Sequence, residues 1–474
     1  MNEFKVMVPG ASAADVVEIT SPYDGSVVGS VERIDEEGAD RALNNASELF
    51  NDRSRWLPVH ERVEVLEKTA ELMQAQFDEL VNLALSEGGK PFTDSQVEVA
   101  RAIDGMKNCI ECVRSEHGTE IPMGINPASS NRLAMTSKEP IGPVMAVSAF
   151  NHPLNLIIHQ VGPAVASGCP VIVKPASDTA LSCFKFVELL REAGLPAEYA
   201  QAVAVTSNVT ATNMVTDPRI AFFSFIGSGK VGWMLKSKLA PGTRCALEHG
   251  GAAPVIVAED ADLGAMLPLL AKGSFYHAGQ VCVSVQRIFV NSKVLEEFLD
   301  KFTPIVSDLK VGDPLIESTD LGPLIRNSEV ERVDKWVKES IDNGSKLLLG
   351  GKKINNTAYD KTILLNPNHN DIISKNEIFG PVVCIYPYEK FESAIEVANS
   401  VNASFQSSIF TNNVNELLKF YQKINASAVF HNDHTAFRVD WMPFSGLKES
   451  GHGVGGIKYT MHEMQIDKML VLRN

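Results

Sequence analysis

The chain has 474 residues, 45% of them hydrophobic and 21% charged, which is too long for one core and predicts two or three domains. Its formal net charge of −15 argues against nucleic acid as a partner, because phosphate binding needs a basic surface. No run of about 18 uncharged apolar residues occurs, so no membrane span is expected. The N-terminus has no basic-then-apolar leader and the seven cysteines are scattered, which together predict a cytoplasmic protein with reduced thiols.

The N-terminal part shows one hairpin signal and several helical runs. Residues 16–33 alternate apolar and polar side chains around Asp24-Gly25, a pattern typical of a β-hairpin. Apolar residues at helical spacing predict three helices, over residues 35–50, 61–85 and 95–114. The third contains a lone C-x-x-C, Cys109 and Cys112. Without a second pair or a histidine cluster nearby we interpret it as structural, and no metal is expected.

Residues 118–137 are rich in Pro and Gly and have weak periodicity, which predicts an extended segment. From Pro140 onwards, apolar strands alternate with helices, the strands covering residues 143–148, 171–174 and 221–226. Unbroken apolar strands between helices indicate a parallel sheet covered on both faces. Such a sheet binds ligands at the carboxyl ends of its strands. No G-x-G-x-x-G dinucleotide fingerprint lies between the first strand and its helix.

A second α/β block follows Glu248 and runs to about Phe430. Its predicted strands are residues 287–290, 346–349, 362–365, 382–386, 407–410 and 428–430. The tail, residues 451–474, ends in extended residues that we expect to pair with the 118–137 segment. No internal repeat and no low-complexity segment is present.

Glu248 and Cys282 are the two residues around which this block is organised, and both stand in glycine-rich settings: Glu248-His249-Gly250-Gly251 and Gly279-Gln280-Val281-Cys282. A thiol attacks as thiolate and therefore needs a base or an electropositive seat. A carboxylate in a partly apolar site can accept a proton near neutral pH. The pair suggests covalent catalysis on a carbonyl. Taken singly, a lone cysteine is more often a small buried hydrophobe, and a glutamate beside glycines is more often a turn residue.

Five further stretches change those odds: Asn151-His152-Pro153, Lys174-Pro175-Ala176-Ser177, Gly227-Ser228-Gly229-Lys230-Val231-Gly232, Glu377-Ile378-Phe379-Gly380-Pro381 and the loop at residues 443–451. In this order, with Glu248 and Cys282 between them, they resemble the NAD(P)-dependent aldehyde dehydrogenase superfamily over nearly the whole chain. That family also lacks the usual dinucleotide fingerprint.

The resemblance implies an aldehyde-dehydrogenase-like α/β fold with two doubly wound parallel-sheet domains and a small β oligomerisation ribbon. Three units are expected: a cofactor-binding domain at 1–117 and 138–248, a catalytic domain at 249–432, and an oligomerisation domain at 118–137 and 453–474. It further implies self-association as a homodimer or homotetramer.

The implied reaction is oxidation of an aldehyde to its carboxylic acid. Cys282 would attack the aldehyde, Asn151 would hold the oxyanion, and Glu248 would activate the water that hydrolyses the resulting thioester. One alternative is a relative in which CoA resolves the thioester. Such relatives generally lack a base at the position of Glu248, which favours hydrolysis. A second alternative is a non-catalytic protein on the same scaffold.

The implied cofactor is NADP or NAD. The residues expected to bind it are Ser148, Phe150, Lys174, Ala176, Ser177, Gly227, Ser228, Val231, Gly232, Glu377 and Phe379. Ser177 stands where the family often has a glutamate, whose charge repels the 2′-phosphate of NADP, so we expect NADP to be accepted. Asp178 is the counter-evidence, because its carboxylate could reach the ribose.

The substrate is expected to be a small polar or anionic aldehyde. Residues 434–440 resemble the family branch that includes lactaldehyde, non-phosphorylating glyceraldehyde-3-phosphate and phosphonoacetaldehyde dehydrogenases. Arg101, His152 and Arg438 would converge at the substrate entrance and attract an anion. The alternative is that the two arginines form structural ion pairs, for example with Glu98 or Asp440. The aldehyde itself cannot be read from the sequence.

Overall fold

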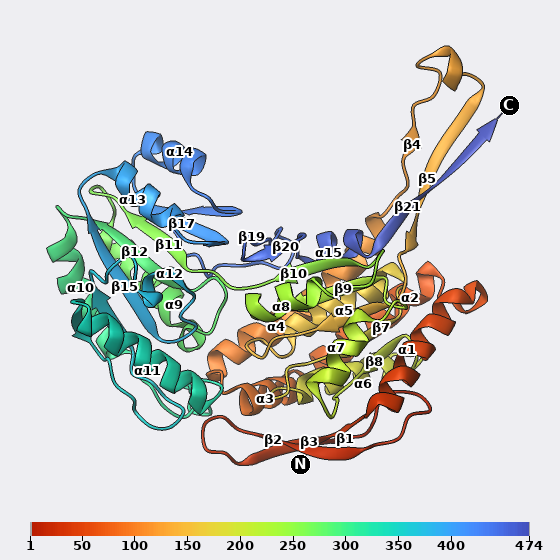
Figure 1. Cartoon of the computed structure of the whole chain (residues 1–474), viewed down its shortest axis with the longest axis horizontal. Helices are drawn as coiled ribbons and strands as arrows, with labels where there is room; N and C mark the ends of the chain where they lie inside the picture. The colour runs from red at the N-terminus through yellow and green to blue at the C-terminus, as the bar shows by residue number, and fades with distance from the viewer. Residues whose placement is uncertain (1, 474) are drawn as a thin grey trace.

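The computed structural model describes residues 2–473 and contains two α/β sheets that lie side by side, with a β ribbon projecting from one of them (Figure 1). The first sheet has the strand order β20-β10-β9-β6-β7-β8. Its strands are parallel except β20, which pairs antiparallel with β10. The strands are β6 (Val144–Val147), β7 (Val171–Lys174), β8 (Ala200–Ala202), β9 (Phe222–Ile226), β10 (Arg244–Glu248) and β20 (Gly451–His452).

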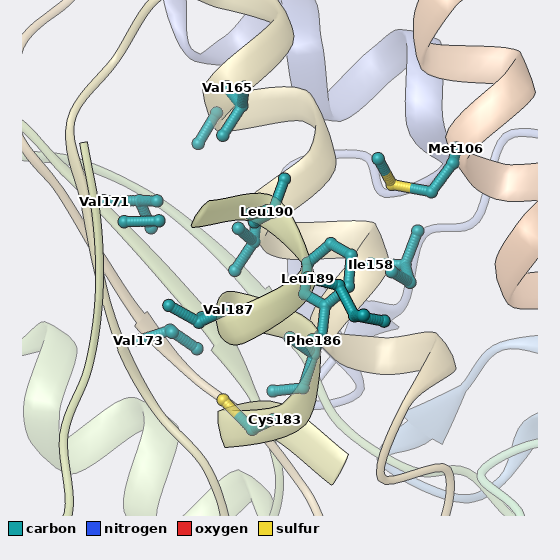
Figure 2. Close-up of a cluster of buried hydrophobic side chains, with 14 of the residues drawn as sticks. Met106, Ile158, Val165, Val171, Val173, Cys183, Phe186, Val187, Leu189 and Leu190 are labelled. Carbon is teal, nitrogen blue, oxygen red and sulfur yellow. The ribbon is translucent and has the colours of Figure 1, made fainter. Parts of the chain in front are cut away.

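Helices cover both faces of the first sheet, as unbroken apolar strands predict. One core holds residues of α2, α3, α4, α5 and α6 against the sheet, and a second core holds α1, α7 and α8 against its other face. Figure 2 shows the first core around Phe186, Val171 and Ile158. These helices are α1 (Glu36–Asn51), α2 (Val59–Ala75), α3 (Phe77–Gly88), α4 (Phe92–Ser115), α5 (Asn155–Ser167), α6 (Leu181–Glu192), α7 (Asn208–Thr216) and α8 (Gly229–Lys236).

Helix α5 is the helix most deeply embedded in this layer. Only Leu156 among its residues is not fully buried, which is the pattern of a helix surrounded by core on every side. It ends at Gly168, whose φ of +87° caps the helix in the left-handed conformation. Because neighbours contact α5 on all sides, side chains near its N-terminal end are held rigidly.

The second sheet has the order β13-β14-β15-β12-β11-β17-β18. It is parallel except for the edge pair β13 and β14. Its strands are β11 (Ala253–Val257), β12 (Val285–Asn291), β13 (Lys346–Leu349), β14 (Thr362–Leu365), β15 (Val382–Tyr388), β17 (Gln406–Phe410) and β18 (Ala428–His431). Its helices are α9 (Leu263–Phe275), α10 (Leu295–Asp308), α11 (Asn327–Asp342), α12 (Ile372–Lys375), α13 (Phe391–Asn399) and α14 (Val414–Lys423).

Three smaller units complete the chain. An N-terminal sheet joins β1 (Asn2–Phe4), β2 (Asp15–Thr20) and β3 (Val27–Arg33), so the predicted hairpin is confirmed. The ribbon joins β4 (Glu120–Ile121), β5 (Arg132–Pro140) and β21 (Gln465–Arg473). The remaining elements are β16 (Ala403–Ser404), β19 (Leu447–Lys448), α15 (Ile457–Glu463) and the short 3₁₀ turns η1 (Arg53–Arg55), η2 (Pro127–Ser129) and η3 (Tyr276–Gly279).

The ribbon confirms that the C-terminal tail pairs with the extended segment. β21 runs antiparallel along the whole of β5, from Gln465 opposite Pro140 to Arg473 opposite Arg132. The tail is not extended throughout, because α15 precedes β21 and contacts α4 and α5. Within β21, Met469 to Leu472 leave between 42% and 56% of their surface exposed. An apolar edge of this kind is unusual on an isolated surface.

The predicted helix over residues 61–85 is wrong in one respect: it is two helices. Gln76 ends α2 and precedes α3 with φ of −107° and ψ of 25°, outside the helical region. The apolar spacing continues across this break, so periodicity alone could not reveal it. Among residues 2–473, no helix is long and apolar enough to cross a membrane.

Candidate active site

The candidate site lies where the carboxyl ends of the first sheet face the loops of the second. Glu248 is the last residue of β10, and Cys282 lies in the turn that precedes β12. Asn151 lies in the loop between β6 and α5. The structure therefore brings together three residues from two different sheets, at the strand ends where open α/β sheets bind ligands.

The turn that carries Cys282 is tightly constrained. His277 and Ala278 both adopt left-handed backbone angles, with φ of 49° and 53°, which non-glycine residues tolerate only where the surroundings enforce them. The side chain of Gln280 anchors the turn: its amide nitrogen donates to the Pro323 carbonyl at 3.2 Å, and its oxygen accepts from the Ile325 backbone at 3.0 Å. Such strain is characteristic of sites in which a side chain must be presented in one orientation.

Asn151 is joined directly to this turn. Its amide nitrogen donates to the carbonyl oxygen of Gln280 at 2.9 Å, and the side chain is almost fully buried. An amide nitrogen carries two donors, so a second N–H of Asn151 is left for another acceptor.

Buried charge holds the start of α5, the helix that follows Asn151. One carboxylate oxygen of Glu98 accepts from the backbone N–H groups of Leu154 and Asn155 at 3.0 and 3.1 Å. The other oxygen pairs with Lys90, and both side chains are fully buried. A carboxylate at a helix N-terminus satisfies free N–H groups and complements the helix dipole.

Burial sets the proton affinities of the candidate catalytic groups. Apolar surroundings and then the nearby Glu377 raise the pKa of Cys282 to about 12, although Arg438 opposes the shift. Burial raises the pKa of Glu248 to about 7, again opposed by Arg438. The thiol is therefore protonated at neutral pH and needs a base, and Glu248 is close to half-ionised there.

Two glycines leave the space in which the carboxylates lie. A Cβ on Gly455 would come within 1.7 Å of an oxygen of Glu248, and a Cβ on Gly250 would come equally close to an oxygen of Glu377. A side chain at either position would therefore displace the carboxylate from the place it has here. Burial raises the pKa of Glu377 to about 8, so this carboxyl is mainly protonated at neutral pH.

A charged cluster adjoins Glu248 and Cys282, and Asp440 is at its centre. Arg101 donates to both Asp440 oxygens, from Nη2 at 2.6 Å and from Nε at 3.1 Å. His159 Nε2 lies 2.7 Å from Oδ1 of Asp440, and Asn155 Nδ2 lies 3.4 Å from the same oxygen. Burial would raise the pKa of Asp440, but His159 and Arg101 outweigh it and hold that pKa well below its usual range.

Arg438 is the second guanidinium of the cluster. Its side chain is 10% exposed, and its charge influences the proton affinity of both Glu248 and Cys282. The guanidinium carbon lies 3.5 Å from the centre of the Phe444 ring. Nη1 is buried and has no hydrogen-bond partner among residues 2–473. A buried donor without a partner costs free energy unless a ligand satisfies it.

Of the three residues predicted to bind substrate, two join this cluster. Arg101 does so through an ion pair with Asp440, which the sequence analysis gave as the alternative to substrate binding. His152 forms no hydrogen bond to the cluster among residues 2–473, and its ring lies 6.1 Å from that of Tyr276 and 6.3 Å from that of His277. Burial holds the pKa of His152 well below its usual range, and the charges of Arg101 and Asp440 both act on it. Sequence reasoning missed Asn155 and His159. Their spacing of four residues at the start of a helix places them on one face, which was the available signal.

Two cavities lie at the predicted cofactor residues. One, of about 200 Å³, is lined by Lys174 to Ser177, by residues 203–208 and by Arg33. Arg33 was not predicted. Its Nε and Nη2 donate to Asp15 at 2.6 Å. Ser177 thus lines a cavity that is also lined by two cations, Lys174 and Arg33. The carboxylate of Asp178 is not free, because Arg326 binds it.

The second cavity, of about 630 Å³, is lined by Gly229, Lys230, His249, Gly250 and Glu377 among others. It opens beside the N-terminus of α8, where backbone N–H groups favour a phosphate. Val231 and Gly232 lie in the first turn of α8, and Ser228 precedes it. Phe150 and Phe379 face each other edge to face, with ring centres 5.8 Å apart.

A dinucleotide fits these features. Ser148 Oγ and Glu377 Oε1 are buried without a partner among residues 2–473, and each could bond a ribose or nicotinamide hydroxyl or amide. The first cavity provides basic side chains, which match a phosphorylated adenosine. The second lies at a helix N-terminus, which matches a pyrophosphate. In that same range no group of three or more histidine, cysteine or acidic side chains could hold a metal ion.

A profile described as the aldehyde dehydrogenase family matches residues 8–470. The chain is 35% identical to 3-sulfolactaldehyde dehydrogenase of Priestia aryabhattai over 461 residues, covering 97% of this chain and 96% of that protein.

Two solved structures are similar throughout. Aldehyde dehydrogenase 21 from Physcomitrella patens, in complex with the reaction product succinate, has a TM-score of 0.96 and 34% identity, covering 100% of this chain and 98% of that chain. A glyceraldehyde-3-phosphate dehydrogenase from Methanocaldococcus jannaschii, complexed with NADP, has a TM-score of 0.92 and 35% identity, covering 97% and 99%.

Proposed function

The chain belongs to the aldehyde dehydrogenase family, and we propose that it oxidises a small aldehyde bearing an anionic group to the corresponding carboxylic acid. The enzyme uses NAD(P) as its oxidant. In this proposal Cys282 is the nucleophile, Asn151 an oxyanion donor and Glu248 the general base. The sulfur of Cys282 is partly exposed within an otherwise apolar group of residues, Val281, Val283, Phe405 and Phe444, so a small carbonyl compound can reach it.

The first step is attack by Sγ of Cys282 on the carbonyl carbon. The thiol must lose its proton as the carbon–sulfur bond forms, because its pKa of about 12 leaves it protonated. Glu248, with a pKa of about 7, accepts that proton. The free N–H of Asn151 donates to the oxygen that becomes negative, and one such donor lowers the barrier by about 3–4 kcal/mol.

The second step is hydride loss from the substrate carbon, which leaves a thioester on Cys282. NAD(P)⁺, when bound, supplies the acceptor for this hydride. Lys174 and Ser177 would hold its adenosine, the 227–232 loop its pyrophosphate, and Glu377 its nicotinamide ribose, with Phe150 and Phe379 beside the ring. Glu248 first releases to solvent the proton that it took from the thiol. Water then attacks the thioester, Glu248 accepts a proton from it and passes that proton to the departing sulfur, so the acid leaves as the thiol forms again.

The charge balance of the Asp440 cluster supports the choice of an anionic substrate. Two guanidiniums, Arg101 and Arg438, share one carboxylate, that of Asp440. Arg101 hydrogen-bonds to it at 2.6 and 3.1 Å, whereas Arg438 lies 3.8 Å from it. Among residues 2–473, Arg438 is thus balanced only by this longer contact with Asp440, at 3.8 Å, and by Glu248, whose pKa of about 7 leaves it partly protonated. A buried cation that is balanced so weakly is unfavourable until an anion binds. Nη1 of Arg438 is the donor that such an anion would satisfy. The named substrates and products of similar proteins, sulfolactaldehyde and succinate, also carry anionic groups.

Self-association through the ribbon belongs to the same proposal. β5 and β21 present exposed apolar side chains, among them Leu133, Met135, Leu470 and Leu472. A second copy of the chain would cover them and convert the edge into an interface. The expected assembly is a homodimer or a homotetramer.

The deciding experiment compares succinic semialdehyde with butanal, which has the same carbon chain without the carboxylate. Each aldehyde is tested with NAD and with NADP, by the absorbance of the reduced nicotinamide. We expect kcat/KM to favour the anionic aldehyde by about a hundredfold, the effect of one charge-assisted contact or more. Equal values, or a preference for butanal, would contradict the anionic class while leaving the oxidation itself intact.

A further inference from the structure

Arg438 is held through an imidazole rather than directly by an acid. Its Nη2 lies 3.4 Å from Nδ1 of His159, whereas its Nε lies 3.8 Å from the nearest oxygen of Asp440. The other ring nitrogen of His159, Nε2, lies 2.7 Å from that oxygen. The ring thus stands between the guanidinium and the carboxylate and contacts both.

The contacts of His159 determine where its proton lies. Asp440 is ionised and can only accept, so the proton of the ring is on Nε2. Burial lowers the pKa of His159 and outweighs Asp440, which raises it, so the ring carries a single proton. Nδ1 then has a free lone pair, and Arg438 Nη2 donates to it. Arg101 and Asn155 also face this group, and both bond to Asp440 rather than to the ring.

This arrangement leaves Arg438 with only one free edge. His159 takes Nη2, the Phe444 ring lies against the face of the guanidinium, and Nη1 stays without a partner among residues 2–473. His159 itself is 4% exposed and lies on α5, whose first N–H groups bond to Glu98. A long arginine side chain has many rotamers, and fixing it beforehand lowers the entropy cost of binding.

We propose that His159 is the positioning residue for substrate recognition: it accepts from Nη2 of Arg438 and so directs Nη1 toward the anionic group of the aldehyde. The inference rests on the anionic substrate class proposed above. Asp440 acts one step further away, because it fixes the tautomer that leaves Nδ1 free to accept. The imidazole bonds Arg438 without neutralising it, so its positive charge is kept for the substrate.

Two substitutions separate the two ring nitrogens. In His159→Gln the side-chain amide can still donate to Asp440, but no acceptor stands at the position of Nδ1. In His159→Asn the amide oxygen takes the place of Nδ1 and can accept from Arg438, while the bond to Asp440 is lost. We expect His159→Gln to raise KM for succinic semialdehyde by about ten- to a hundredfold, the cost of one bond to a charged group. His159→Asn should raise it less.

The controls exclude a merely structural effect. KM for butanal, and kcat for both aldehydes, should change little in either variant, and the Kd of succinate measured by calorimetry should follow KM for the anionic aldehyde. His60→Gln is the matched control, since His60 is 73% exposed. Equal increases of KM for both aldehydes, or an unchanged KM in His159→Gln, would overturn the role of His159.

The outcomes also separate this inference from the proposed function. A wild-type enzyme without preference for the anionic aldehyde refutes the substrate class. A preference that survives in His159→Gln refutes only the positioning role. Should the variants unfold, nitrogen-15 NMR of histidine-labelled wild-type enzyme tests the idea directly: His159 should show a protonated Nε2 and a bare Nδ1 at neutral pH. An imidazolium, or a proton on Nδ1, would disprove it.

Discussion

Arg326 binds Asp178 through both carboxylate oxygens, each 3.0 Å from its Nε. Asp178 follows Ser177 directly and was the residue most able to replace the missing glutamate in the adenosine pocket. Because the Asp178 carboxylate is already engaged, Ser177 lines the cavity that would hold the ribose, together with Lys174, without a free carboxylate beside it. This relationship strengthens the expectation that the enzyme accepts NADP.

Ser177→Glu should therefore make the enzyme select against NADP. Two like unit charges about 4 Å apart at an effective dielectric of about 20 repel by about 4 kcal/mol, an upper value for this partly open cavity. We expect the ratio of kcat/KM for NADP to that for NAD to fall by about a hundredfold. Ser177→Asn, which adds volume without charge, is the control and should change the ratio little. An unaltered ratio in the glutamate variant would place the selector elsewhere.

Cys282→Ala should abolish aldehyde oxidation, because no other group can carry the covalent intermediate. Binding of the reduced cofactor should persist, as measured by the quenching of tryptophan fluorescence. Cys245→Ala is the matched control: this thiol is also partly exposed but lies near the middle of β10. Turnover in Cys282→Ala above about one part in a thousand of the wild-type rate would be incompatible with the proposed mechanism.

Glu248→Gln should slow both the attack of the thiol and the hydrolysis of the thioester, because the same carboxylate accepts a proton in each step. The wild-type steady-state rate should rise with pH through about 7, because burial raises the pKa of Glu248 to that value and only the ionised carboxylate accepts a proton. Stopped-flow absorbance of the reduced nicotinamide measures the first turnover and the steady state. A wild-type rate that is flat between pH 6 and 8, with near-normal turnover in the variant, would assign the base to another residue.

Gly455→Ala should inactivate the enzyme although Gly455 carries no reactive group. The added methyl would meet an oxygen of Glu248 at 1.7 Å, so the carboxylate must move. A displacement of about 1 Å can cost about a hundredfold in rate. The control is Gly264→Ala, where the added carbon meets only Oδ1 of Asp262, at 3.4 Å. Near-normal hydrolysis in Gly455→Ala, with a folded protein by circular dichroism, would show that Glu248 has more freedom than its contacts suggest.

Charges on the ribbon should weaken self-association. Leu470 and Leu472 are 53% and 44% exposed on β21, and lysine at both positions would place two cations in the expected interface. Analytical ultracentrifugation at micromolar concentration should then show a smaller species than the wild-type protein gives. The same pair of lysines at Val16 and Val59, which are 59% and 53% exposed elsewhere, controls for the added charge. A wild-type monomer would refute the proposal at once.

The sequence predicted the parts of the site that are local in the chain and missed the parts that are assembled from afar. Glu248, Cys282 and Asn151 each stand in a short motif, and their roles stay predictions. The contacts of Asp440 join α4, α5 and a loop near the C-terminus, and no local pattern encodes such a meeting. The sequence could therefore offer an ion pair between Arg101 and Asp440 only as one alternative, and it did not identify His159.

The fold shows the same division. Apolar strands and helices were recognised because their periodicity is local, and the pairing of β5 with β21 followed from two extended segments. The break at Gln76 was missed, because the apolar spacing continues from α2 into α3. Strand β13 was predicted at residues 346–349, but its antiparallel direction was not, since strand direction depends on the connection and not on the residues of the strand.

The space that receives Glu248 is closed by Gly455, and β10 is flanked at the sheet edge by β20. The residues that complete this pocket thus leave the ribosome long after the base and the nucleophile. Domains generally fold as their chain emerges, so the parallel strands of both sheets can form during synthesis while the pocket stays open. A nascent chain held on the ribosome before residues 451–455 emerge should accordingly be folded but inert, and it should gain activity only after they emerge.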